Sequence, residues 1–570
     1  MANAFCILYN RVSMRRKISS SLRIELIAVV LMTVVMTVLN SLHVLREWLR
    51  NPPDRLFAGI TQYFADYFLY VSHIQWGILG GIIFAPHRFT NEPLPYTWIY
   101  WFYVLLGRIG GMAGLSPFFL YNAALILLVI GVILLWYYLC FRLFPTDRLA
   151  RLSGFIAVLT ASSFIDFQAL QTQGILRLLG YFWFTPAPSF NRLGGVPHQL
   201  FQNILYMLLI LLVASLINRW SMRKKISGFA YCLLAILTFF AATSNPIQIV
   251  VCTITVASAA LLFFILNKRW NMSGVIMLAV MGIVALGGAG LTNAHFAAIP
   301  VYAVGKIWEA TQVVPVTGLT FLYAVGPILF LIPFGVYPFL RRPDPLRILL
   351  VGYLVVSIVI FFSPIPQILG TAKPRWLSPV SYSVLAIIAG QGVSTVVAYA
   401  KRRKKLLGWL AGGTIALLYA LLTVPALIHQ IQAHIDPVAN PHMLLDTDYN
   451  HIPKPTVEGL RVLAKLPTTP DTRVVLADIQ MPIEILVPAF TDKTSFTGQP
   501  VHTLYPMEKE SLRSKFYALS MTPDEARIFF RNHSIGYILS SAGHVGALAK
   551  TYPFLAQKYQ NSLLTIFSTQ

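Results

Sequence analysis

Carboxylates are scarce in this chain, so their positions indicate where chemistry could occur. Only 21 of the 570 residues are Asp or Glu. Asp66 lies in an aromatic-rich segment where Tyr70, His73 and Gly77 follow at helical spacing, so the four residues lie roughly on one helix face. Such a polar stripe on an otherwise apolar helix either lines a cavity or faces water, and spacing alone does not decide between the two. Asp66 is therefore the first candidate for a catalytic carboxylate.

A second carboxylate, Glu92, follows in the turn-rich stretch 89–93, shortly before an apolar segment at 99–106 that is too short to cross a bilayer. Glu92 could orient a substrate or the first carboxylate. It could equally stabilise the start of the following helix through the helix dipole. Two isolated carboxylates could also hold one hard cation, but they lack a close third ligand, so we expect no metal site.

Three basic residues could bind an anion. Arg375 stands at the start of an apolar run, two residues after Lys373, and Arg192 lies in another polar segment. A guanidinium offers a planar fork of N–H donors that matches a phosphate, so Arg375 is the strongest of the three. The alternative for Arg375 is an ordinary anchor whose charged end reaches the membrane surface.

Two further polar residues stand at the edges of apolar runs. His198 opens one run, and Asn245 precedes Pro246 at a break between two others. Either side chain could face a substrate cavity. A helix-capping histidine is the alternative for His198, and a simple turn is the favoured interpretation of Asn245-Pro246.

Composition determines what kind of fold must position these residues. Hydrophobic residues make up 56% of the chain and charged residues only 11%, and the mean hydropathy is +0.66. Soluble domains carry roughly 25% charged residues, so the composition excludes a water-soluble fold. We therefore expect an α-helical polytopic membrane protein.

Apolar runs of about 17–25 residues are typical of membrane-spanning helices. Eleven such runs are found at 24–44, 117–140, 152–170, 198–217, 227–243, 246–266, 272–291, 317–340, 346–363, 376–398 and 406–428. The first follows a basic segment, as in a signal peptide. It is too long for one and lacks a small-residue cleavage site, so we interpret it as an uncleaved anchor.

Basic residues alternate between the connections. Clusters such as Lys401–Lys405 occur in every second connection, whereas the connections between them are longer and poorer in Lys and Arg. This alternation predicts an inside N-terminus and an outside C-terminus. It also explains the net charge of +23, so no nucleic-acid partner is expected. We expect a multi-pass protein of the cell membrane (plasma or inner membrane) whose C-terminal region is extracytoplasmic.

The C-terminal region differs in composition from the rest, because it holds 12 of the 21 acids from about residue 430 onward. Strand patterns alternate with helical ones, which predicts a small α/β domain with a mostly parallel sheet. The expected strands are 473–478, 535–541 and 562–568, and the expected helices follow Thr456, cover 508–520 and begin at the capping box 522–525. The predicted domains are therefore a membrane domain at 1–429, whose first outer loop at 45–116 carries interfacial helices, and an extracytoplasmic domain at 430–570.

This architecture resembles the GT-C superfamily, which comprises membrane glycosyltransferases that use polyprenyl-linked sugar donors, such as protein O-mannosyltransferases and aminoarabinose transferases. The segments 66–77 and 89–93 are similar to the first outer loop of bacterial members, and 373–379 resembles an Arg-aromatic-Leu-x-Pro segment found late in several members. The outer domain after the last span is a further similarity. The first loop departs from the mannosyltransferases, because it has no Asp-x-Asp or Glu-x-Asp pair and no tandem Asp-Glu.

The resemblance implies inverting transfer of a sugar from a polyprenyl phosphate to a cell-envelope glycan, lipid or protein. Asp66 would then be the general base, and Glu92 would orient the acceptor or the base. Arg375, with Lys373 and Arg192, would bind the donor phosphate, while Tyr70, His73, His198 and Asn245 would line the substrate cavity. The implied partners are the lipid donor, the bilayer and an unspecified acceptor, and we expect no cofactor.

Two other functions are compatible with a polytopic chain. A secondary transporter usually has internal pseudo-symmetry and ionisable residues near mid-membrane, and the sequence shows neither feature. A non-enzymatic factor that assembles or flips cell-envelope polymers would instead use the outer α/β domain as its working part. Substitution of Asp66 separates the enzyme from both alternatives.

Overall fold

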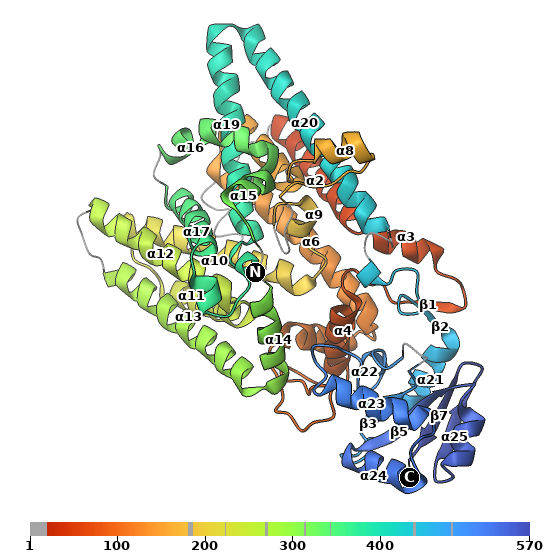
Figure 1. Ribbon diagram of the computed structural model, residues 1–570. Helices are drawn as coiled ribbons and strands as arrows, with labels where there is room; N and C mark the ends of the chain where they lie inside the picture. The colour runs from red at the N-terminus through yellow and green to blue at the C-terminus, as the bar shows by residue number, and fades with distance from the viewer. Residues whose placement is uncertain are drawn as a thin grey trace.

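The computed structural model describes residues 20–180, 186–222, 224–267, 272–312, 315–341, 344–436, 441–479 and 483–569. The basic segment before residue 20 lies outside these ranges. Long helices fill most of the molecule, and the C-terminal sheet with its own helices lies at one end of them (Figure 1).

Eight helices in the described ranges are long and apolar enough to cross a membrane. They are α2 (Ser20–Asn40), α6 (Pro117–Leu143), α10 (Pro197–Ser221), α12 (Pro246–Asn267), α13 (Met272–Ala298), α17 (Pro345–Phe362), α19 (Pro379–Arg403) and α20 (Lys405–Ile435). A ninth span arises if α15 (Gly318–Val325), the 3-10 turn η1 (Gly326–Phe330) and α16 (Ile332–Leu340) are counted together, although this pair bends by 73°. The chain is thus a multi-pass membrane protein.

Each of the eleven expected runs contains helix, but not every run is one long helix. α11 (Gly228–Ser244) has 17 residues. The run at 152–170 is wrong as a continuous span, because α7 (Arg148–Thr160) stops early and α8 (Phe167–Gln173) starts a new helix capped by Asp166. The run at 317–340 breaks at Gly326, where φ is +73° and a Cβ would lie 1.8 Å from the Ser162 carbonyl oxygen. The number of eleven spans therefore stays a prediction.

Local sequence explains where several of these helices begin. The Ser116 hydroxyl accepts a hydrogen bond from the Phe119 amide at 3.2 Å, and Pro117 occupies the first turn of α6. The same Ser-Pro arrangement begins α19, where Ser378 accepts from the Ser381 amide at 3.4 Å. A serine cap satisfies a free N–H group, and proline presets the helical φ. The residues just before α19, Arg375 among them, are therefore held at a defined helix start.

Shorter elements lie in the connections between the long helices. The first connection contains α3 (Leu42–Arg50), β1 (Arg55–Phe57), α4 (Phe64–Ile78) and α5 (Trp101–Gly111), and later connections contain α9 (Ser189–Leu193), α14 (Pro300–Thr311), α18 (Ile365–Ile368) and the 3-10 turn η2 (Lys373–Trp376). α4 and α5 cross at two glycines: a Cβ on Gly77 would lie 2.0 Å from the Val104 carbonyl oxygen, and one on Gly107 would lie 1.9 Å from the Ile74 carbonyl oxygen. Only glycine permits this approach, which fixes α4 and its polar stripe.

The C-terminal region forms a five-stranded sheet with strand order β4-β3-β5-β7-β6. Its elements are η3 (Pro441–Met443), β2 (His451–Pro453), α21 (Lys454–Lys465), β3 (Val474–Ala477), α22 (Val487–Phe490), β4 (Thr494–Ser495), α23 (Pro506–Tyr517), α24 (Pro523–Asn532), β5 (Ile535–Ser541), α25 (Val545–Thr551), β6 (Ala556–Gln560) and β7 (Leu564–Ser568). The capping box at Thr522 is present, as expected. The sheet is only half parallel: β3 pairs in parallel with β4 and β5, whereas β7 is antiparallel to β5 and β6.

The C-terminal domain packs directly on the first connection. β1 pairs with β2, and α22 packs on α4. Side chains on β3 alternate between two clusters: Val475 and Ala477 share one with Phe68 of α4, while Val474 and Leu476 share another with α23 and α24. Because a strand presents alternate side chains to opposite faces, one face of the sheet rests toward the membrane helices and the other is covered by its own helices.

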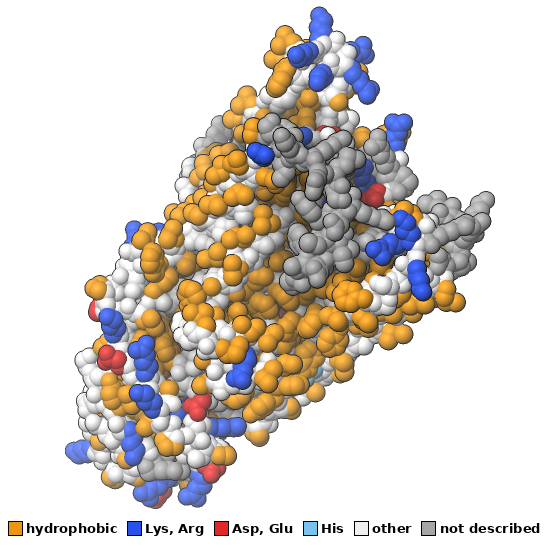
Figure 2. Space-filling model, turned by 180° about the vertical axis from the view of Figure 1, so that it is seen from behind, with side chains coloured by type: hydrophobic (Ala, Val, Ile, Leu, Met, Phe, Trp, Pro, Cys, Tyr) orange, Lys and Arg blue, Asp and Glu red, His pale blue; other side chains and the backbone are white. Residues whose placement is uncertain are grey.

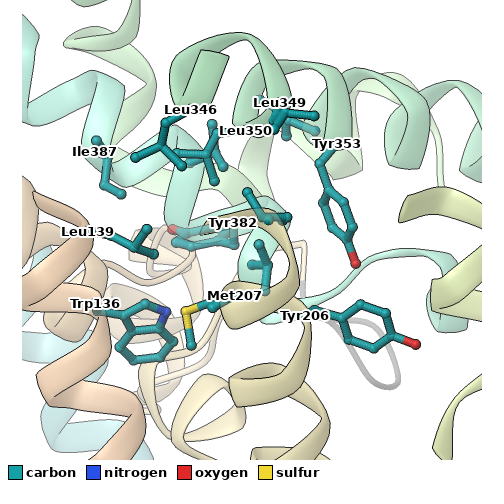
Figure 3. Close-up of a cluster of buried hydrophobic side chains, with 14 of the residues drawn as sticks. Trp136, Leu139, Tyr206, Met207, Leu346, Leu349, Leu350, Tyr353, Tyr382 and Ile387 are labelled. Atoms are coloured by element: carbon teal, nitrogen blue, oxygen red, sulfur yellow. The ribbon is translucent and has the colours of Figure 1, made fainter. Parts of the chain in front are cut away.

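The main core lies among the membrane helices. Figure 3 shows aromatic and aliphatic side chains from α6, α10, α17 and α19 that pack together, among them Trp136, Met207, Tyr353 and Tyr382. On the face seen in Figure 2, exposed hydrophobic side chains are spread over the surface between the two ends of the molecule. Lys and Arg side chains gather at the tip of the α19–α20 hairpin, which carries Lys401–Lys405, and the C-terminal domain lies at the opposite end. This arrangement agrees with the predicted orientation, which remains a prediction.

Candidate active site

The helix expected around Asp66 is present as α4, and Asp66 lies in its first turn. A carboxylate at this position is favoured by the positive end of the helix dipole. The neighbouring residues Ala65, Tyr67 and Phe68 are completely buried, while Asp66 itself keeps partial exposure. The packing of α4 therefore holds this carboxylate at the edge of the protein core.

The surroundings of Asp66 shift its ionisation. Burial raises the pKa of the Asp66 carboxyl to about 6, while the nearby Arg375 charge and a hydrogen bond from Gln499 act in the opposite direction. The Gln499 amide nitrogen lies 3.4 Å from Asp66 Oδ1. At neutral pH the carboxylate is mostly ionised and is a stronger base than an ordinary aspartate.

Arg375 lies in the 3-10 turn η2, and its charge interacts with both Asp66 and Tyr70. Its guanidinium forms an ion pair with Glu309 of α14, and about a third of its side chain is exposed. The Arg375 carbonyl oxygen accepts a hydrogen bond of 2.5 Å from the side-chain NH₂ group of Gln248. Lys373 occupies the same turn and is partly buried. The Arg375 charge is thus near enough to Asp66 to lower the pKa of that carboxyl.

A cavity of about 80 Å³ lies beside α4. It is lined by Tyr70, Ile99, Tyr100, Trp101, Phe102, Tyr103, His198, Phe201, Gln202 and Ser244. The Tyr70 ring stacks on Tyr103 with 4.6 Å between ring centres, and the Tyr103 hydroxyl lies 2.8 Å from His198 Nδ1. Aromatic walls with a few polar groups suit a small polar ligand that has apolar faces.

The other two predicted cavity residues contact this lining without being part of it. His73 stacks on Tyr100 with 4.3 Å between ring centres, and burial lowers the pKa of its imidazole well below the usual value. Asn245 donates a hydrogen bond of 3.2 Å to Gln202 and accepts one of 3.1 Å from the Gln248 amide at the start of α12. Asn245 therefore serves as a cap between two helices, and the part it plays toward a substrate stays a prediction.

Glu92 is held by a different set of contacts. Its carboxylate accepts hydrogen bonds from Thr90 and, at 2.9 Å, from the Lys509 ammonium of α23. Among the described residues, no hydrogen bond or ion pair joins Glu92 to Asp66. α5 begins at Trp101 with Tyr100 at the capping position, so Glu92 does not cap it. Its contacts tie the first connection to the C-terminal domain, and a role in orienting the base or acceptor stays a prediction.

Arg192 does not join this site. Its buried guanidinium donates to the backbone carbonyls of Val158 at 2.9 Å, Pro186 at 3.0 Å, Ala161 at 2.6 Å and Ala187, and it lies 4.4 Å from the centre of the Tyr382 ring. The N–H groups of Arg192 are thus used in hydrogen bonds to the backbone carbonyls of two neighbouring segments. A phosphate-binding role for Arg192 is thus a prediction that the observed contacts do not support.

Sequence reasoning assigned no role to two residues that lie at the site. Gln499 reaches Asp66 across 433 positions of sequence, and no local pattern indicates that contact. Glu309 is one of the few acids outside the C-terminal region, and the rarity of acids there is the sequence feature that could have indicated a role for it. Within the described ranges, no group of three His, Cys, Asp or Glu residues is arranged to hold a metal ion.

No protein-family model matches the sequence, and no match was found among the curated proteins. Three similar solved structures are an archaeal oligosaccharyltransferase, a bacterial ArnT and a mycobacterial arabinofuranosyltransferase, and all three belong to the GT-C superfamily. The oligosaccharyltransferase AglB from Archaeoglobus fulgidus, in complex with an inhibitory peptide and a dolichol-phosphate, is 11% identical at a TM-score of 0.49, and the match covers 95% of this chain and 74% of AglB. ArnT from Cupriavidus metallidurans bound to undecaprenyl phosphate is 12% identical at a TM-score of 0.44, and the match covers 96% of this chain and 98% of ArnT. AftD from Mycobacteria is 13% identical at a TM-score of 0.49, and the match covers 94% of this chain and 40% of AftD. With every TM-score below 0.5, these similarities do not assign a function to the chain, and the residues at the site have to do so.

Proposed function

We propose that this chain is a membrane glycosyltransferase that transfers a sugar from a polyprenyl-phosphate donor to a hydroxyl group of a cell-envelope glycan, lipid or protein. The observation that carries the proposal is the placement of Asp66 within electrostatic reach of Arg375, beside an aromatic-lined cavity and among apolar helices. A displacement on a sugar phosphate requires a base for the acceptor hydroxyl and a cation for the leaving phosphate.

Asp66 acts as the general base in this proposal. It takes the proton from the acceptor hydroxyl as that oxygen attacks the anomeric carbon, and the bond between the anomeric carbon and the phosphate oxygen breaks in the same step. The product is an inverted glycoside and a free polyprenyl phosphate. The raised pKa of about 6 suits this role, because the group is ionised at pH 7 and yet binds a proton readily.

Arg375 stabilises the negative charge that develops on the leaving phosphate. The Glu309 carboxylate forms an ion pair with this guanidinium, so it competes with an incoming phosphate for the same N–H donors. An incoming phosphate then shares the guanidinium with Glu309 or displaces that carboxylate. Lys373, in the same turn, is the second candidate for a phosphate contact.

The cavity lined by Tyr70 and His198 is the proposed site for the sugar ring. Tyrosine rings offer flat faces to the C–H groups of a sugar, while His198 and Gln202 can exchange hydrogen bonds with its hydroxyls. The lipid chain of the donor would lie along the exposed apolar helices, of which α13 and α20 carry many uncovered side chains. In the predicted orientation, with Lys401–Lys405 cytoplasmic, this site and the C-terminal domain face the outside of the cell membrane.

Binding of a defined lipid donor tests the proposal. Wild type and Arg375→Ala in nanodiscs are titrated with a set of short-chain polyprenyl-phosphate sugars, and polyprenyl alcohol serves as the control ligand. We expect saturable binding that requires the phosphate and weakens at least about tenfold in Arg375→Ala, the loss typical of a charged hydrogen-bonded contact. Equal binding of the alcohol and the sugar phosphate would contradict the proposal and favour a transporter or an assembly factor.

A further inference from the structure

One short segment of the C-terminal domain reaches across to the predicted base. Residues 498–504 lie against the first connection, where the Thr503 hydroxyl donates to the Phe89 carbonyl at 2.9 Å and the Leu504 amide donates to the Thr90 hydroxyl at 3.1 Å. The His502 ring also lies 3.1 Å from the Tyr100 hydroxyl. The segment is therefore anchored near α4 independently of Asp66.

The orientation of the Gln499 amide is fixed from within this segment. Its side-chain oxygen accepts hydrogen bonds from the backbone amides of Val501 at 2.7 Å and His502 at 2.6 Å. Because backbone N–H groups can only donate, the oxygen must face them, and the NH₂ group must point the other way. That group meets Asp66 Oδ1 at 3.4 Å, and the Gln499 side chain is only 1% exposed.

The turn that presents Gln499 depends on the residue before it. Gly498 has φ of +134°, a conformation that other residues rarely adopt, and a Cβ there would lie 3.3 Å from Glu484 Cγ. The Gln499 NH₂ group is therefore a preorganised donor. Gly498 sets the turn, two backbone hydrogen bonds fix the amide oxygen, and the side chain is almost completely buried. Such a donor costs little reorganisation when the group it faces changes its charge or position.

We propose that Gln499 is a positioning residue, by which the C-terminal domain completes the active site: it holds Asp66 Oδ1 so that the second carboxylate oxygen takes the acceptor proton. This inference rests on the proposed role of Asp66. It gives the C-terminal domain a part in every turnover, beyond any contact it makes with an acceptor. The bond also opposes the rise in the Asp66 pKa that burial causes, so the donor keeps the base ionised.

Two variants of Gln499 separate its two hydrogen-bonding functions. Gln499→Leu removes both the bonds within the segment and the donor to Asp66. Gln499→Glu keeps an oxygen for the amides of Val501 and His502, but it replaces the donor by a second negative charge beside Asp66. Thr503→Val is the matched control, because it removes a buried hydrogen bond of the same segment that does not involve Asp66.

Turnover of a polyprenyl-phosphate sugar is measured against pH for the full-length variants in nanodiscs. We expect Gln499→Leu to lower kcat about tenfold or more, as for loss of a hydrogen bond to a charged group. The donor KM should stay within about twofold, because the donor itself makes no contact with Gln499 in this account. The acid limb of the pH profile should move to higher pH in Gln499→Leu and further in Gln499→Glu, whereas Thr503→Val should match wild type.

A wild-type pH profile in both Gln499 variants would overturn the inference, and so would an equal loss of kcat in Thr503→Val. If Gln499→Leu does not fold, Gln499→Glu decides, since it retains the bonds within the segment. Asp66→Asn is measured in parallel. Turnover that persists in Asp66→Asn would contradict the proposed function, whereas an inactive Asp66→Asn beside an unaffected Gln499→Leu would contradict only the inference about Gln499.

Discussion

Arg375 and Glu309 form an ion pair between η2 and α14, and the Arg375 charge lowers the pKa of the predicted base Asp66. Both side chains are partly exposed, so the pair itself contributes little to stability. It matters for binding, because a donor phosphate and the Glu309 carboxylate would both be attracted to the same guanidinium. A change at Glu309 should therefore alter the affinity for the donor.

Glu309→Gln should strengthen donor binding. The substitution removes a carboxylate that competes with the phosphate. Exposed pairs of this kind are worth about 0.2–1 kcal/mol, so we expect Kd to fall by a factor between about 1.4 and 5. The measurement is titration of a polyprenyl-phosphate sugar in nanodiscs at low and high salt. The gain should shrink at high salt, and a weaker affinity in Glu309→Gln would show instead that the carboxylate is needed to hold Arg375 in place.

The rate should depend on pH through Asp66. A base must be ionised to accept a proton, and burial raises the pKa of Asp66 from the ordinary value of 3.8 to about 6. Activity should therefore be full above about pH 7 and fall about tenfold for each unit below pH 6. The kcat profile between pH 4.5 and 8, with stability verified at each pH, tests this expectation. A rate that stays constant down to pH 5 would mean that Asp66 is not the titrating base.

Glu92→Gln should lower the stability of the protein clearly while changing kcat little. Glu92 forms an ion pair with the nearly buried Lys509 ammonium. Burial lowers the pKa of Lys509, and the Glu92 carboxylate acts in the opposite direction and raises it. Breaking such a pair leaves an uncompensated charge, at a cost of about 3 kcal/mol or more. The melting temperature should fall, and the double variant with Lys509→Met should recover part of it. A loss of kcat beyond about tenfold in folded Glu92→Gln would instead support the predicted orienting role.

Gly107→Ala should disturb the site from a distance. The added Cβ would lie 1.9 Å from the Ile74 carbonyl oxygen, so α4 and α5 must separate and move Asp66 and Tyr70. We expect destabilisation of about 1–3 kcal/mol and a clear loss of activity. Gly282→Ala in α13 is the control, because a Cβ there meets nothing within 4 Å. Equal behaviour of the two variants in thermal unfolding and turnover would contradict the packing described for α4.

Parts of this site could be predicted from sequence because they depend on local periodicity. The spacing of Asp66 and Tyr70 predicted a helix with a polar stripe, and α4 has that form beside a cavity. The strand at 535–541 and the capping box at Thr522 were likewise readable from local pattern. Residues of these kinds take their structure from near neighbours, so a single sequence is enough to place them.

The remainder depends on contacts that no local pattern encodes. Arg192 has the right residue type for a phosphate ligand, yet its donors are taken by backbone carbonyls that only tertiary structure brings near. The 152–170 run breaks where Ser162 lies against Gly326, because a Cβ on that glycine would lie 1.8 Å from the Ser162 carbonyl oxygen. Gln499 meets Asp66 only because the C-terminal domain docks on the first connection. Each difference arises where packing between distant segments decides the outcome.

The most direct test of the account is the fate of the sugar in Asp66→Asn. A polyprenyl-phosphate sugar of defined anomeric configuration is supplied with a hydroxyl acceptor, and the new glycosidic bond is followed over time. Asp66→Asn should fold and bind donor as wild type does, because burial disfavours only the charged form of Asp66. Wild type should yield the inverted glycoside, and the variant should be slower by about 10²–10⁴-fold, the range expected for loss of a general base. Transfer by Asp66→Asn at the wild-type rate, or transport of donor with no glycoside formed by wild type, would contradict the account.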